Sequence, residues 1–128
     1  MAKQINVTVN VEATDAGETM FERQHEQAGE VGDIISGTAR VLAGASKRIC
    51  VAGEENAAAA PISLDLTKIR GFILDLDVEF ELRIDLATEG QLVGPGQVAV
   101  SRTAVDGFAL VNNGSAQGNV RYYVWGDQ

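Results

Sequence analysis

Apolar and polar residues alternate along much of this chain with a period of two. The clearest case is residues 71–86, GFILDLDVEFELRIDL, where every second position from Phe72 to Leu86 is apolar and most positions between them are charged. This period places apolar side chains on one face of a strand and polar ones on the other. The pattern therefore predicts strands with one buried face.

Similar short segments recur from end to end, punctuated by glycine about every ten residues. Residues 20–30, MFERQHEQAGE, are the exception and fit either a short helix or an exposed strand with a loop. No helical period lasts beyond about two turns. We predict one all-β domain over residues 1–128, a sandwich or barrel of eight to nine short strands, with residues 1–12 as an N-terminal arm or first strand. The predicted strand segments are 5–11, 33–44, 47–53, 62–69, 70–75, 78–86, 97–102, 107–113 and 119–127.

The stretch 71–86 is long for one strand, since strands usually run about three to ten residues. Aspartate is disfavoured inside strands and favoured in turns. We therefore predict a strand at 70–75, a tight corner at Asp75–Asp77 and a strand at 78–86. The outline of 69–85 returns in 105–127, because each begins with an apolar residue, a charged residue and Gly-Phe and ends in Asp. The echo suggests two equivalent hairpins of a sandwich.

Charge and cysteine content narrow the class of protein. The net charge of −8 argues against binding to nucleic-acid phosphates or to an anionic membrane surface. Cys50 is the sole cysteine, which excludes an intrachain disulfide and fits a reducing compartment. It lies in an apolar run and is interpreted as a buried small hydrophobic residue. The N-terminus lacks the apolar core of a signal peptide, and no apolar run reaches the length of a membrane span.

The carboxylates of 75–85 are the most conspicuous candidate for chemistry. A flat row on one strand points in parallel, with neighbours about 7 Å apart, whereas calcium needs six to eight converging oxygens. Asp75 and Asp77 at the corner would be the best ligands, but we expect no metal site. A glycosidase pair is less favoured still, since it needs a sugar cleft with aromatic platforms. The alternatives are a solvated face, an edge charged against aggregation, or a surface that meets basic groups on a partner subunit.

Other catalytic arrangements are not supported by the sequence. His25 is the sole histidine, so a zinc site or a serine triad would depend on that one residue. The closing segment YYVWGD places Tyr122 and Val124 on one face and Tyr123 and Trp125 on the other. Either Tyr123 and Trp125 are exposed interface anchors, or both faces of a central strand are buried.

The segments KIRGFILDLDVEFELRID and VDGFALVNNGSAQGNVRYYVWGD resemble a pattern in small virion structural proteins of tailed bacteriophages. The similarity covers about 60 residues, from Ile62 to Asp127. It implies an antiparallel, jelly-roll-like β-sandwich that serves as a capsid decoration (cementing) protein or in tails and fibres, usually as a trimer. In cementing proteins the N-terminal part often reaches over neighbouring capsid subunits.

We therefore expect a structural virion protein without enzymatic activity or cofactor, made in the host cytoplasm and carried on the capsid surface. Its expected partners are the major capsid protein or other virion subunits, and further copies of itself. The alternative is a tail or fibre module that binds a carbohydrate or another surface ligand. The residues expected at interfaces are Ile5, Val7, Tyr123, Trp125, Asp75, Asp77, Glu79 and Glu81.

Overall fold

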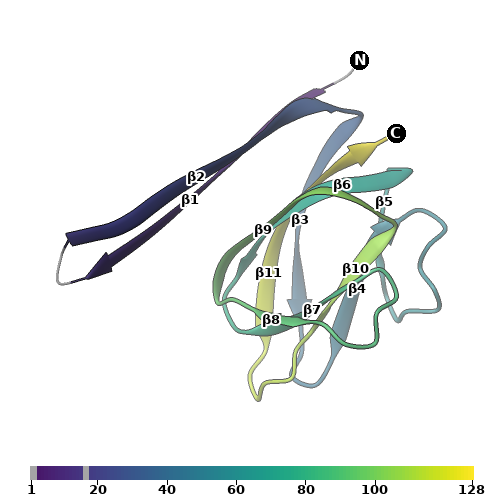
Figure 1. The fold of residues 1–128 in the computed structure, drawn as a ribbon. Helices are drawn as coiled ribbons and strands as arrows, with labels where there is room; N and C mark the ends of the chain where they lie inside the picture. The colour runs from purple at the N-terminus through teal and green to yellow at the C-terminus, as the bar shows by residue number, and fades with distance from the viewer. Residues whose placement is uncertain (1–2, 16–17) are drawn as a thin grey trace.

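The computed structural model describes the backbone of residues 3–15 and 18–128, and the side chains of 32–100 and 103–128. These residues form strands, turns and loops, and they include no helix that could cross a membrane (Figure 1). The strands are β1 (Lys3–Asp15), β2 (Glu18–Val31), β3 (Asp33–Val41), β4 (Ser46–Val51), β5 (Ile62–Leu64), β6 (Lys68–Leu76), β7 (Phe80–Ile84), β8 (Gln91–Val93), β9 (Gly96–Val105), β10 (Gly107–Val111) and β11 (Gly118–Asp127).

Two sheets form a β-sandwich, which confirms the predicted all-β class. One sheet has four strands in the order β3-β11-β6-β9, and the other has five in the order β5-β4-β10-β7-β8. The pairings are antiparallel except for that of β4 with β5, which is parallel. The side chains facing inward from both sheets make one core, and the largest of those that are fully buried are Phe72, Phe80, Phe108, Ile49, Ile69, Leu74 and Leu110.

The split of residues 71–86 is confirmed, but the predicted hairpin is wrong. β6 ends at Leu76 and β7 begins at Phe80, so the chain does turn at Asp77. However, β6 belongs to the four-stranded sheet and β7 to the five-stranded one. The same holds for β10 and β11 in the second unit of the echo. Both units therefore cross from one sheet to the other, and the apolar face of each strand still lies against the shared core, so the alternation is satisfied by this arrangement too.

The two units of the echo pair with each other. β6 lies beside β11, with Leu76 opposite Val120, and β7 lies beside β10, with Leu82 opposite Leu110. The two Gly-Phe motifs meet across the sandwich, where the rings of Phe72 and Phe108 stack with centroids 4.0 Å apart and planes inclined by 13°. The repeated sequence thus builds the centre of both sheets.

Strands β1 and β2 form a separate two-stranded ribbon, here called the arm (residues 3–31). Thirteen and fourteen residues long, they pair with each other and with no other described strand. Figure 1 shows the arm extending away from the sandwich. Residues 20–30, for which the sequence fits either a short helix or an exposed strand with a loop, belong to strand β2.

The described residues thus contain eleven strands where eight or nine were predicted. β5 falls within the predicted segment 62–69, so the two strands that were not predicted are β2 and β8, and β8 has only three residues, too few to leave an alternating pattern in the sequence. β2 was not predicted as a strand because its sequence is polar at most positions and shows no regular alternation.

Candidate functional site

The structure divides the row of carboxylates from 75 to 85 between the two outer surfaces of the sandwich. Asp75 lies on β6 in the four-stranded sheet, whereas Glu81 lies on β7 in the five-stranded one. Asp77 and Glu79 lie in the turn that joins those sheets. The interpretation of these carboxylates as one acidic face is therefore wrong, because the chain passes from one sheet to the other in the middle of the row.

Asp77 is used to hold the turn against β11. One carboxylate oxygen accepts a hydrogen bond of 2.7 Å from the backbone N–H of Asn119, and the other accepts one of 2.8 Å from the Asn119 Nδ2. The Asp77 N–H in turn donates to the Asn119 carbonyl. The hydrogen bonds from the Asn119 backbone and side chain lower the pKa of Asp77 below its usual range. This carboxylate closes the corner between the sheets.

The side chain of Glu81, on the outer surface of the five-stranded sheet, is also engaged in hydrogen bonds within the chain. It accepts hydrogen bonds from Arg83 Nε at 3.0 Å, from the Gly90 N–H at 2.8 Å and from Asn113 Nδ2 at 3.2 Å. The hydrogen bond from Arg83 is the main cause that lowers the pKa of Glu81. These contacts tie β7 to the β7–β8 turn and to the loop after β10. Among the described residues, no three histidine, cysteine or acidic side chains gather as metal ligands.

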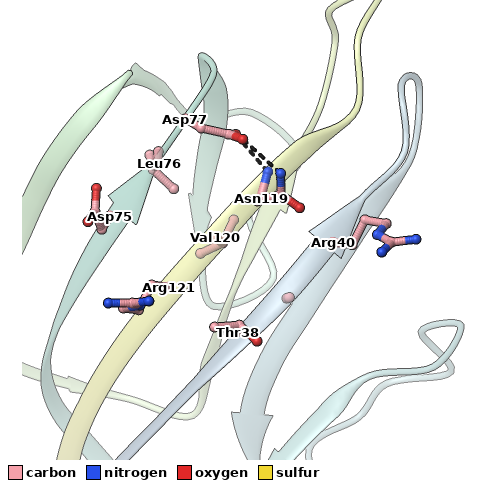
Figure 2. A pocket seen from close by; sticks show the side chains of 9 residues that line it. Thr38, Arg40, Asp75, Leu76, Asp77, Asn119, Val120 and Arg121 are labelled. Atoms are coloured by element: carbon pink, nitrogen blue, oxygen red, sulfur yellow. Dashed lines mark hydrogen bonds between the residues drawn. The ribbon is translucent and has the colours of Figure 1, made fainter.

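An open hollow of about 550 Å³ lies on the outer surface of the four-stranded sheet (Figure 2). Its polar lining comes from Thr38 and Arg40 on β3, Asp75 on β6, Asp77 in the turn after β6, and Asn119 and Arg121 on β11. Arg121 on β11 lies opposite Asp75 on the neighbouring strand β6 and opposite Thr38 on the other neighbour, β3. Figure 2 shows Arg121 on the side of Asp75 and Arg40 extending to the other side of the hollow.

The ion pairs resolved among described side chains do not involve Arg40, Asp75 or Arg121. These three groups are exposed and free to meet a ligand or a partner. Of Arg40, Asp75 and Arg121, the sequence analysis identified only Asp75 as a candidate. It missed the two arginines because they are isolated charges in alternating strands, and only the pairing of β3 with β11 brings them to one surface.

The aromatic residues of β11 divide as their alternation predicts, with one correction. Tyr122 and Val124 face the core, and Tyr123 on the outer side is 39% exposed. Trp125, proposed as an exposed anchor, is only 1% exposed and packs with Ile34 and Ile73. Its ring occupies the space over Gly71, where any Cβ would collide with the indole. Of the two aromatics, Tyr123 alone remains available as a surface anchor.

Ile5 and Val7 both lie on β1, whose backbone is described, while their side chains fall outside the described part. Cys50 is buried as predicted, and burial raises the pKa of its thiol. Its neighbour Arg48 is a buried cation that the sequence did not reveal. It donates from Nε to the Glu54 carbonyl at 2.8 Å and from Nη1 to the Asp85 carbonyl at 2.9 Å, so it holds two loops against β4.

The corner contact predicts a pH dependence for Asp77→Asn. A carboxyl whose folded pKa is depressed stabilises the fold above its unfolded pKa, and this contribution is lost as the pH falls through the folded pKa. The variant should therefore melt below the parent at about pH 7, with the gap closing towards about pH 3. Thermal melts across that range test this expectation. A gap that is the same at both ends would contradict it, and Asp75→Asn is the matched control at an exposed carboxyl without a resolved ion pair.

Comparison with known proteins yields no match, either to a family model, to a curated protein or to a solved structure.

Proposed function

We propose that this chain is a structural virion protein of tailed bacteriophages, most specifically a capsid decoration protein that binds the assembled head as a trimer. The observation that carries the proposal is the combination of a two-sheet sandwich with a long arm that extends beyond it (Figure 1). The sandwich has one packed core, and the arm adds reach for contacts with neighbouring subunits. The resemblance of residues 62–127 to such proteins gives the same assignment.

The strand pairing supports a jelly roll within this proposal. If the short β5 is set aside, eight strands from β3 to β11 remain. The first of these pairs with the eighth (β3–β11), the second with the seventh (β4–β10), the third with the sixth (β6–β9) and the fourth with the fifth (β7–β8). This is the pairing of one long antiparallel ribbon rolled into two four-stranded layers, as in jelly-roll capsid domains.

The proposed mechanism is mechanical. A protein that binds the assembled head but not its separate subunits stabilises the head by mass action. The exposed groups of the hollow, with Tyr123 beside them and the arm, supply the surface for such contacts. Asp77 lines the hollow, and its hydrogen bonds to Asn119 fix that end of the surface, whereas Glu81 orders loops on the opposite surface of the sandwich.

The test mixes the purified chain with expanded empty capsids and separates bound from free protein by sedimentation. We expect saturable binding and a higher disruption temperature for decorated capsids. Arg121→Glu and Tyr123→Ala should each reduce binding, whereas Thr88→Ala, at an exposed turn away from the hollow, is the control. A chain that stays in the supernatant at every concentration would refute the proposal.

The hollow also favours a second candidate, a carbohydrate-binding module of a tail or fibre. Hydroxyl, amide, carboxylate and guanidinium groups line it, and Tyr123 follows Arg121 on the same outer side of β11. Sugar sites combine polar groups of this kind with aromatic platforms. A glycan array separates the two candidates, because glycan binding lost in Arg121→Glu, without binding to capsids, would favour the module.

A further inference from the structure

One flank of the sandwich presents an unprotected strand edge. β9 is ten residues long and pairs with β6 on one side, while no described strand pairs with its other side. An open edge offers a row of free N–H and C=O groups, and proteins usually block such edges with lysine, proline or inward charges. Residues 96–105 contain no proline or lysine, and Arg102 is their one charged residue.

The neighbouring edge of the other sheet continues this flank. β8 is the terminal strand of the five-stranded sheet, and its Leu92 is 61% exposed. Residues 90–105, which include both edge strands, contain no acidic residue in a chain with a net charge of −8. The flank is therefore apolar and weakly basic, and it suits an acidic strand.

The arm has the complementary properties. It contains six acidic and two basic residues, and no described strand of the sandwich pairs with it. A two-stranded ribbon alone in water is marginally stable at best. In the sequence of β1, Ile5, Val7, Val9 and Val11 alternate with polar residues, which is the pattern of a strand with one apolar face.

The arm and the open edge are on opposite sides of the same sheet. β2 leads into β3 through Gly32, whose N–H donates to the Gly126 carbonyl at 2.8 Å. β3 is one edge of the four-stranded sheet and β9 is the other. A donor and an acceptor on opposite sides of one subunit produce head-to-tail contacts, which close into a ring when the rotation allows.

We propose that the arm of one copy adds to the free edge of β9 in the next copy and extends the four-stranded sheet across the subunit boundary. The thirteen residues of β1 are long enough to span the ten of β9. Main-chain hydrogen bonds give the contact its strength, as in other cases of strand addition. The contact needs no capsid, so it is tested on the purified chain, and its failure leaves the capsid assay unaffected.

The experiment uses single cysteines and a short bis-maleimide linker. Thr8→Cys places a thiol on β1 and Ala99→Cys places one at the exposed side of β9, while the native Cys50 is buried and supplies little background. We expect a mixture of the two variants to give a cross-linked dimer. Chains carrying both substitutions should give closed rings whose subunit number matches the mass from light scattering. Thr38→Cys, exposed on β3 at the opposite edge, is the control partner for Thr8→Cys and should cross-link several-fold less.

Three results would overturn the proposal. Cross-linking of Thr8→Cys chains to each other would show arm-to-arm contact instead, and cross-linking of Ala99→Cys chains to each other would show pairing of two β9 edges. If the parent chain is monomeric at micromolar concentration, the proposed contact between arm and β9 is excluded, and so are the arm-to-arm and β9-to-β9 contacts. Circular dichroism of each variant verifies that the strands are intact, and Asn10→Cys provides a second arm position if Thr8→Cys fails to fold.

Discussion

Replacing Phe108 by Ala should lower the free energy of unfolding by about 3–5 kcal/mol, a large share of the stability of a domain of this size. Phe108 and Phe72 are both fully buried, and their rings stack at 4.0 Å between the two sheets. Truncation removes the transfer free energy of the ring and leaves a cavity that the close-packed sheets cannot fill. Phe72→Ala should cost a similar amount for the same reason.

Denaturant titrations of Phe72→Ala, Phe108→Ala and the double variant measure these costs. The double variant should be less destabilised than the sum of the singles by about 0.5–1.5 kcal/mol, the range for coupling between paired aromatic rings. Tyr123→Ala, at a 39% exposed aromatic on the outer surface, is the control and should cost much less. Strict additivity of the two core substitutions would contradict a direct contact.

The alternation in residues 71–86 predicts the buried residues well and their arrangement poorly. Phe72, Leu74 and Phe80 are buried as the pattern requires. The pattern is the same whether two successive strands lie side by side or on opposite layers, since in either case the apolar face meets the core. The echo between 69–85 and 105–127 therefore suggested hairpins, although its real meaning is that the two units pair with each other.

The candidate site was even less accessible from the sequence. Arg40 and Arg121 are far apart along the chain and share a surface only through the β3–β11 pairing. Trp125 fits an exposed position by its alternation, but Gly71 on the adjacent strand makes room for the indole. The alternation of residue types predicts which face of its own strand a side chain occupies. Whether that side chain is exposed depends on the residues of the neighbouring strand, and the local sequence does not encode which strand that is.

Asn112 shows how a single polar residue in a turn-like sequence can carry a large effect. It is fully buried, and its Nδ2 donates to the Val41 carbonyl at 3.0 Å and to the Ala116 carbonyl at 2.8 Å. Its Oδ1 accepts from the Gly114 N–H at 3.0 Å. One amide thus holds the loop after β10 and joins it to the end of β3. In NNGSAQG, nothing distinguishes Asn112 from the exposed Asn113.

Asn112→Asp should therefore destabilise the fold by about 3 kcal/mol or more at neutral pH. The ionised carboxylate would face two backbone carbonyls with no proton to donate, and burial would oppose its charge. Because burial raises the pKa of the introduced carboxyl, its penalty should shrink as the pH falls towards about 4 and the group regains a proton. Asn112→Ala loses all three hydrogen bonds of the amide, whereas the aspartate keeps an acceptor for the Gly114 N–H; the alanine adds no charge, so its penalty should be large and nearly independent of pH.

Asn113→Asp is the matched control for the Asn112 variants. Asn113 is exposed, and its side chain makes one resolved hydrogen bond, of 3.2 Å, to Glu81. Its replacement should change stability by less than about 1 kcal/mol. Urea titrations at neutral and acid pH measure all three variants. If the Asn112→Asp penalty were no larger than that of Asn113→Asp, the buried amide could not be what orders this loop.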